Sequence, residues 1–160
     1  MIILGIDPGT KRMGFGVVKK EGSFLSLLEA GILDSPDGGA VSLATIKKRL
    51  DSLFLSYRPS ALAIERLYFS KNQKTAIAVA EARGVAVLAA EERGVPILEY
   101  TPTEVKSSLA GYGGADKKAV AKMVRLILGE PTLDLIDDAY DAIALSLVAF
   151  SDPKTRIKGY

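Results

Sequence analysis

Residues 2–16, IILGIDPGTKRMGFG, determine the fold that the sequence predicts. Residues 2–6 form a continuous apolar run rich in β-branched side chains, the pattern of a buried central strand. The run stops at Asp7, and a Pro-Gly pair then turns the chain. A lone carboxylate therefore follows directly on a strand that is expected to lie in the interior.

Two further strands are expected over residues 13–19 and 24–32, with a turn at Glu21-Gly22 between them. Together with the first strand they form a three-stranded antiparallel meander. Helical spacing and short apolar runs then alternate along the chain. We predict helices over residues 43–57, 74–93, 102–109, 117–128 and 138–150, and strands over residues 61–64 and 97–100. The fold class is therefore α/β: a five-stranded mixed sheet, antiparallel first and then parallel, flanked by helices.

The length of 160 residues suits one domain. We assign it to residues 1–150 and treat residues 151–160, which are basic and lack periodicity, as a loosely ordered tail. The start MIILGID lacks the pattern of a signal peptide, and no apolar stretch approaches the roughly 20 residues of a membrane span. We therefore expect a cytoplasmic protein.

The composition narrows the chemistry. The chain contains no cysteine and no histidine, which excludes thiolate nucleophiles, zinc-cysteine sites and the commonest general base. Catalysis is left to carboxylates, hydroxyls, lysines or hard cations. The net charge is only +2, so a nucleic-acid surface would have to come from uneven placement of charge.

Four acids occupy the ends of apolar elements. Asp7 and Glu65 each follow a buried strand, and strands on either side of a crossover are often neighbours, so these carboxylates could converge at one end of the sheet. Asp138 and Asp141 are three residues apart and share one face of the last predicted helix. Two of them have an ordinary alternative: Asp7 as a turn residue, and Asp138 with Asp137 as partners of the helix dipole. Asp141 resists that alternative because it lies a full turn inside an apolar helix.

Gathered carboxylates repel one another unless a cation neutralises them, so such a cluster indicates bound metal. Oxygen ligands without His or Cys favour Mg²⁺ or Mn²⁺ over zinc. We expect two Mg²⁺ ions per subunit, with Mn²⁺ as a possible substitute, because paired hard cations suit phosphodiester hydrolysis.

At this point the chain resembles a known family, the bacterial RuvC-type Holliday-junction resolvases of the ribonuclease H-like superfamily. The resemblance covers nearly the whole domain through segments in the family's order: GIDPGTKRMGFG, AIERLYFSKNQKTA, AEARGVAVLAA, EYTPTEVKSSLAGYGGADKKAV and DAYDAIALSL. It implies that Asp7, Glu65, Asp138 and Asp141 form the catalytic metal site. Many members have histidine where Asp138 stands, and aspartate is also seen there.

The resemblance further implies the activity and the partners. The expected substrate is four-way junction DNA, nicked symmetrically in two strands to leave 5′-phosphate and 3′-hydroxyl ends in recombination and repair. A homodimer is implied, as are contacts with the RuvAB branch-migration complex. In the helix predicted over residues 74–93 a mostly small stripe could let a second helix approach, although packing on the sheet explains it equally well. The stripe consists of Ala76, Ala80, Gly84 and Leu88.

Basic and aromatic residues mark the expected DNA surface. In the segment RLYFSKNQK, aromatic rings interleaved with cations suit stacking on unpaired bases, although a solvated loop with core-packed rings is the alternative. The resemblance favours DNA contact by Tyr68, Phe69, Lys71 and Asn72. The resemblance also implies that Lys106 and Lys117 contact DNA and are not ordinary surface lysines. Lys118 shares a helical face with Lys122 and Arg125, where a solvated face is the default interpretation. Lys11 and Arg12 are assigned to ordinary surface.

Three rival functions remain at the level of sequence. An ATPase of the actin, hexokinase and Hsp70 type also opens with a Gly-Ile-Asp strand, but it needs two lobes and this chain supplies one. A ribonuclease H-like enzyme that processes ribosomal RNA precursors shares the opening motif and is the main alternative. A DNA-binding module without catalysis is disfavoured by the four retained acids.

Overall fold

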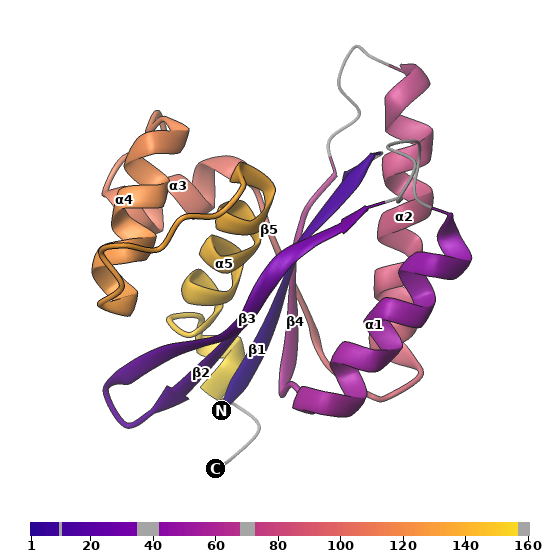
Figure 1. Cartoon of the computed structure of the whole chain (residues 1–160), viewed down its shortest axis with the longest axis horizontal. Helices are drawn as coiled ribbons and strands as arrows, with labels where there is room; N and C mark the ends of the chain where they lie inside the picture. Colours follow the sequence, from indigo (N-terminus) through magenta and orange to yellow (C-terminus); the bar gives the residue numbers. More distant parts are fainter. Residues whose placement is uncertain (10, 35–41, 68–72, 157–160) are drawn as a thin grey trace.

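The computed structural model describes residues 1–9, 11–34, 42–67 and 73–156. Its centre is a five-stranded mixed sheet in the order β3-β2-β1-β4-β5 (Figure 1). Strands β1, β2 and β3 are antiparallel, whereas β4 and β5 run parallel to β1. The bounds are β1 (Ile2–Asp7), β2 (Arg12–Glu21), β3 (Phe24–Asp34), β4 (Ala61–Glu65) and β5 (Ile97–Tyr100). The predicted fold class is confirmed.

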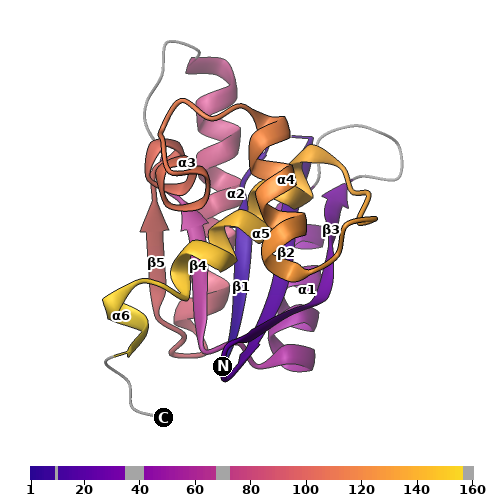
Figure 2. The same ribbon diagram turned by 90° about the vertical axis from the view of Figure 1, so that its left-hand side faces the viewer.

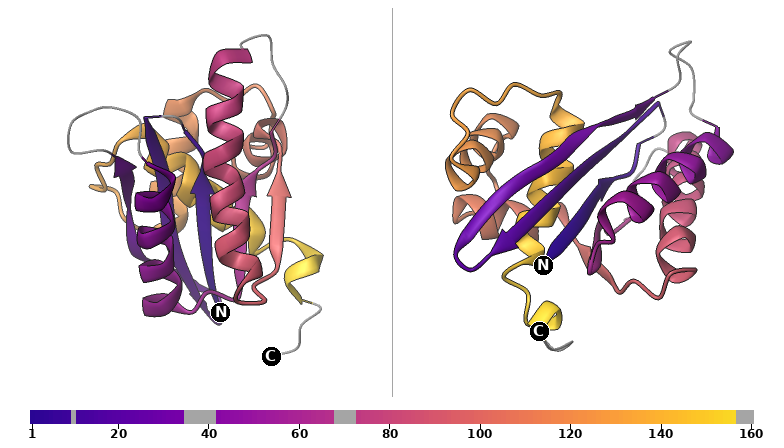
Figure 3. Two further views of the ribbon diagram at one scale, coloured as in Figure 1. Left: turned by 90° about the vertical axis from the view of Figure 1, so that its right-hand side faces the viewer. Right: turned by 60° about the horizontal axis from the view of Figure 1, so that its bottom comes forward.

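Helices cover both faces of the sheet. One face carries α1 (Leu43–Tyr57) and α2 (Gln73–Glu91), which stand in front of the strands in the left view of Figure 3. The other face carries α5 (Asp137–Ala149), with α3 (Pro102–Ala110) and α4 (Lys117–Leu128) packed against it (Figure 2). Among the described helices none is both long and apolar enough to cross a lipid bilayer.

Alternation along the strands divides the core into two layers. On β1, Leu4 and Ile6 belong to the apolar cluster under α1 and α2, and Ile3 belongs to the cluster under α5. On β4, Leu62 and Ile64 likewise face α1 and α2. Because side chains alternate between faces, the strand-end acids at positions 7 and 65 lie on the α5 side.

Three glycines bring α5 unusually close to the sheet. A Cβ atom at Gly5 would lie 2.0 Å from the Ala142 carbonyl oxygen, and one at Gly14 would lie 1.9 Å from that of Asp138. At Gly16 it would meet Ile143, and the Gly16 carbonyl instead accepts a hydrogen bond of 2.9 Å from the Ser146 hydroxyl. No side chain larger than hydrogen fits under α5 at these positions, so the glycines set its height above β1 and β2.

The helix ends follow local chemistry. The hydroxyl of Thr101 accepts from the Glu104 amide and the Glu104 carboxylate accepts from the Thr101 amide, a capping box with Pro102 in the first turn. Within the predicted tail, Pro153–Arg156 form a short helix, α6. Just before it, the Tyr100 hydroxyl donates to Asp152 Oδ2 at 2.8 Å, which ties this segment to β5.

Candidate active site

The sheet register places two of the four acids side by side. Asp7 is the last residue of β1 and Glu65 the last of β4, and these parallel strands pair Ile6 with Ile64 immediately before the acids. In the antiparallel direction Asp7 is opposite Gly14, which has no side chain to fill the space beneath α5. Both carboxylates therefore end at one edge of the sheet, on the face that α5 covers.

Helix α5 brings the other two acids to the same edge. Asp138 and Asp141 lie in its first two turns, and the contact between Gly14 and the Asp138 carbonyl fixes the start of the helix over β2. Burial, and after it the negative charges of Glu65, Asp141 and Asp138, together raise the pKa of Asp7 to about 8. A carboxyl group influenced by three others shows that the four acids share one electrostatic site.

Two lysines oppose this concentration of negative charge. Burial raises the pKa of Glu65 and of Asp141, and the positive charge of Lys106 offsets part of each rise. Burial alone would lower the pKa of Lys117, but Asp141 and Asp137 raise it overall. An open cleft of about 210 Å³ lies between these groups. It is lined by Glu65, Pro102, Val105, Lys106, Lys117, Val120, Asp141 and Leu145.

The acids on α5 are engaged by cations of the chain itself. Arg12 Nε lies 3.1 Å from Asp138 Oδ2, and Lys117 Nζ lies 3.9 Å from Asp141 Oδ2 and 3.4 Å from Asp137 Oδ2. Within the part of the chain that the structure describes, no three acidic side chains are turned so as to enclose a metal ion. The backbone therefore brings α5 over the ends of β1 and β4, while the carboxylates of Asp138 and Asp141 point to Arg12 and Lys117.

This donor set fits a hard divalent cation. It consists of carboxylate oxygens alone, which Mg²⁺ and Mn²⁺ prefer. The raised pKa of Asp7 reflects its burial first and the repulsion of the neighbouring acids second, and a cation between the acids would relieve that repulsion. Coordination would require the side chains of Asp138 and Asp141 to turn away from Arg12 and Lys117, a rotamer change that leaves the backbone in place.

The predicted DNA-binding residues fall into two groups. Lys106 and Lys117 line the cleft beside the acids, and the exposed Lys118 follows Lys117 in the first turn of α4. Tyr68, Phe69, Lys71 and Asn72 lie outside the described residues. Arg125 does not belong to a solvated basic face, because its Nε donates to the Leu133 carbonyl at 2.7 Å and its guanidinium lies 5.1 Å from the centre of the Tyr140 ring.

Sequence reasoning missed two arginines near the acids. Arg83 of α2 donates from Nε to the Glu65 carbonyl at 3.2 Å and pairs with Glu99 of β5, so it fixes the end of β4. Arg12, assigned to ordinary surface, pairs with Asp138. Strand alternation offered a signal for Arg12, because it shares a strand face with Gly14 and Gly16. The position of Arg83 on a weakly amphipathic helix offered none.

A mixed sheet with acids on the ends of two neighbouring parallel strands, faced by acids on a helix that crosses them, is the arrangement of a ribonuclease H-like nuclease. The family model described as "Crossover junction endodeoxyribonuclease RuvC" matches residues 3–149. The chain belongs to this family.

Relatives and solved structures agree with this assignment. The chain is 47% identical to the crossover junction endodeoxyribonuclease RuvC of Rubrobacter xylanophilus over 99% of its own length and 90% of the relative's. It is 46% identical to that of Chloroflexus aggregans over 92% and 91% of the two chains. It superposes on Thermus thermophilus RuvC in complex with a Holliday junction substrate with a TM-score of 0.84 and 36% identity, covering 94% of each chain.

Proposed function

We propose that this protein is a metal-dependent endonuclease that resolves four-way DNA junctions by nicking two strands symmetrically. The observation that supports the proposal is a cleft in which Glu65 and Asp141 lie opposite Lys106 and Lys117, in a chain of the RuvC family. The charges of Glu65, Asp138 and Asp141 also act on the neighbouring Asp7. The alternative substrate, precursor ribosomal RNA, has no comparable support.

The four acids would hold two Mg²⁺ ions, or Mn²⁺ in their place. When bound, such ions neutralise phosphate charge and lower the pKa of the attacking water, which suits hydrolysis to a 5′-phosphate and a 3′-hydroxyl. Asp7 and Glu65 contribute rigidity, because each ends a hydrogen-bonded strand. Asp7 must also give up the proton that its raised pKa retains near neutral pH.

Lysines of the cleft would bind the DNA backbone. Lys106 and Lys117 come from α3 and α4, so they approach the acids from the outer side of the cleft, where a phosphate could lie between lysine and carboxylate. Lys118 would extend this cationic edge. We propose that Tyr68 and Phe69 stack on bases at the junction centre and that Lys71 and Asn72 contact the nearby strands.

The symmetric substrate implies a symmetric protein. Two cuts related by a two-fold axis call for two active sites, so the working form would be a homodimer acting with the RuvAB complex on chromosomal junctions in the cytoplasm. Within the α2 stripe, Gly84 and Leu88 are exposed in the single chain and Ala76 and Ala80 are half-buried, so its second half is available for such a contact.

The direct test compares a synthetic four-way junction with a linear duplex of the same sequence, both with Mg²⁺. We expect paired cuts at symmetry-related positions in the junction and none in the duplex, and no cuts with Asp7→Asn. The asparagine has the same shape but lacks the charge. Equal cutting of the duplex, or of a structured RNA in preference to the junction, would refute the proposed substrate.

A further inference from the structure

Arg12 lies where its charge acts directly on a carboxylate of the site. It is the first residue of β2, and its Nε lies 3.1 Å from Oδ2 of Asp138 in the first turn of α5. At this distance the guanidinium and the carboxylate form a close ion pair. That carboxylate oxygen therefore has a cationic partner before any metal arrives.

The backbone on both sides of this ion pair is fixed. Arg12, Gly14 and Gly16 alternate along β2 on the face toward α5, and the Asp138 carbonyl oxygen lies 1.9 Å from where a Gly14 Cβ would be. The preceding turn is equally tight, because a Cβ at Gly9 would lie 2.0 Å from the Arg12 carbonyl oxygen. Arg12 and Asp138 are therefore held opposite each other by close backbone contacts.

The side chains of Arg12 and Asp138 can nevertheless separate by rotamer changes. The Arg12 side chain is 49% exposed and that of Asp138 is 25% exposed. A half-exposed guanidinium can swing into solvent without leaving a buried charge unpaired, so the separation costs little. The aspartate would then be free to turn toward Asp7 and Asp141.

We propose that Arg12 is an internal counter-cation of Asp138 that competes with the divalent metal for this carboxylate. The inference rests on the proposed function, in which Asp138 is a metal ligand. Arg12 shields Asp138 from its acidic neighbours in the metal-free protein and lowers the apparent metal affinity. It is thus a positioning residue of the site and not a ligand.

The test measures Mn²⁺ binding to the whole protein without DNA, by calorimetry and by loss of the free-ion electron paramagnetic resonance signal. We expect Arg12→Ala to bind Mn²⁺ roughly two- to five-fold more tightly than wild type at low salt, the range that an exposed ion pair permits. The gain should shrink at 0.5 M KCl, about where ionic screening suppresses such a pair. Lys11→Ala is the matched control: it removes the same charge one residue away, from an exposed side chain that has no ion pair with another described residue. Its affinity should stay close to that of wild type.

A double-mutant cycle with Asp138→Asn identifies the route of the effect. In the asparagine background the removal of Arg12 should no longer raise the affinity, because the contested carboxylate is absent. Unchanged Mn²⁺ affinity in Arg12→Ala, an equal gain in Lys11→Ala, or a gain that persists without Asp138 would each overturn the inference while leaving the metal site intact. Failure of wild type to bind Mn²⁺, with no difference from Asp7→Asn, would overturn the inference and the proposed function together.

Discussion

For a single residue, the proposed metal ligand Asp7, the folded structure carries a cost in stability. Its carboxyl group lies at the end of a central strand, where burial and three acidic neighbours raise its pKa to about 8. The unfolded chain releases this proton near the ordinary value of 3.8. Between these two values the folded state binds more protons than the unfolded state, so the free energy of unfolding falls as the pH rises.

The substitution Asp7→Asn should therefore stabilise the metal-free protein in a pH-dependent way. In the presence of chelator we expect no gain at pH 4, a gain that grows as the pH rises, and a plateau above pH 8. The shift from 3.8 to about 8 corresponds to a plateau of roughly 4–6 kcal/mol, or about 8–24 °C in Tm. Thermal unfolding followed across this pH range measures the effect. A gain of the same size at pH 4 and pH 9 would show that proton binding by Asp7 is not its source.

Lys106 and Lys117 carry a second prediction at this scale. Each phosphate contact that is lost should flatten the salt dependence of junction binding, by about one unit in the slope of log Kd against log salt. We expect this for Lys106→Ala and for Lys117→Ala in binding titrations without metal. Lys48→Ala is the control, because Lys48 is exposed on α1, on the opposite face of the sheet. A slope unchanged from wild type in the two cleft variants would argue against phosphate contact.

At the scale of secondary-structure elements, the placement of α5 on the glycines of β1 and β2 decides whether the site exists. Gly14 lies under Asp138 at the start of the helix, and Gly5 and Gly16, which pair across β1 and β2, lie under Ala142 and Ile143 one turn later. A methyl group at position 14 cannot be accommodated against a carbonyl oxygen 1.9 Å away without moving the start of α5. Such a shift would separate Asp138 and Asp141 from the strand-end acids.

We therefore expect Gly14→Ala to harm cleavage more than folding. Junction cleavage should fall by about 100-fold or more, as for a small misplacement of catalytic groups. The free energy of unfolding should fall by roughly 1–3 kcal/mol, as for overpacking. Gly31→Ala is the control, because its Cβ would meet only the Phe15 ring, at 3.2 Å. Cleavage by Gly14→Ala at the wild-type rate would mean that the height of α5 does not position the acids.

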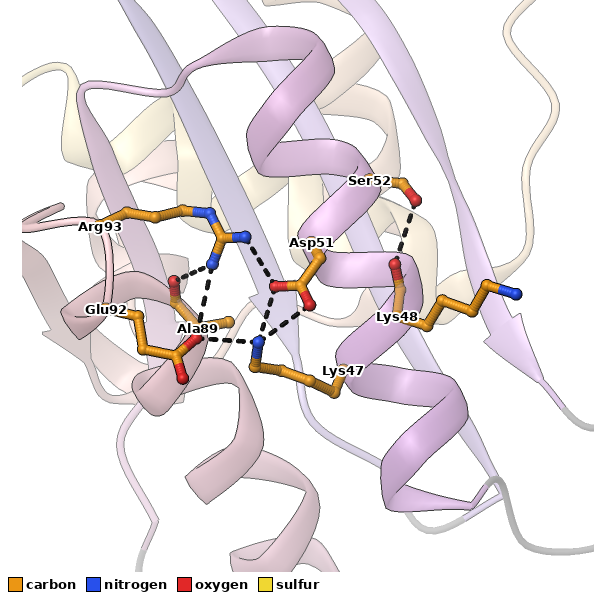
Figure 4. Close-up of polar contacts among 7 residues, drawn as sticks. All are labelled: Lys47, Lys48, Asp51, Ser52, Ala89, Glu92 and Arg93. Carbon is orange, nitrogen blue, oxygen red and sulfur yellow. Dashed lines mark hydrogen bonds and ion pairs between the residues drawn. The ribbon is translucent and has the colours of Figure 1, made fainter.

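A charged network joins α1 to the end of α2 on the opposite face (Figure 4). Lys47 Nζ lies 2.8 Å from Asp51 and 2.8 Å from Glu92, and Arg93 Nη2 lies 2.8 Å from Asp51. The Arg93 guanidinium also lies 5.4 Å from the centre of the Phe54 ring. Asp51 is the acceptor that Lys47 and Arg93 share, and the hydrogen bond from Lys47 lowers the pKa of this aspartate.

Loss of this acceptor should affect stability and leave catalysis unchanged. Asp51→Asn is expected to lower the free energy of unfolding by roughly 1 kcal/mol at low salt, and by less in 1 M NaCl, where screening weakens exposed ion pairs. Lys48→Ala, on the same helix, should change neither quantity. Denaturant unfolding and junction cleavage measure the two effects, and a drop in cleavage with intact folding would contradict a purely structural role.

At the scale of the whole molecule, much of the architecture could be predicted from the sequence. Strand alternation and turn residues predicted the sheet, and helix boundaries lay within two residues because caps such as Thr101 and left-handed Gly111 are local signals. The side-chain partners could not be predicted. Arg12 and Asp138 are far apart in the chain, and their pairing depends on how closely α5 packs on β2. The short helix after Asp152 depends likewise on a distant tyrosine.

The proposed dimer gives a prediction in which one substitution stabilises the single chain and weakens the dimer. Gly84 is exposed on α2, and a Cβ there would meet no described atom of its own chain. Alanine should therefore stabilise the isolated helix by roughly 0.5–1 kcal/mol. If the α2 stripe is the dimer contact, the same methyl group should hold the helices apart and raise the dissociation constant of the dimer by about ten-fold. Analytical ultracentrifugation measures this constant, and an unchanged value would place the dimer contact elsewhere.

The most direct test of the central claim is anomalous X-ray diffraction from crystals of this protein soaked in Mn²⁺. We predict anomalous peaks for two ions among Asp7, Glu65, Asp138 and Asp141, with carboxylate oxygens in direct contact with the ions and the Asp138 side chain turned away from Arg12. Occupied manganese sites elsewhere, with this edge of the sheet empty, would contradict the claim that the four acids form a metal-dependent nuclease site.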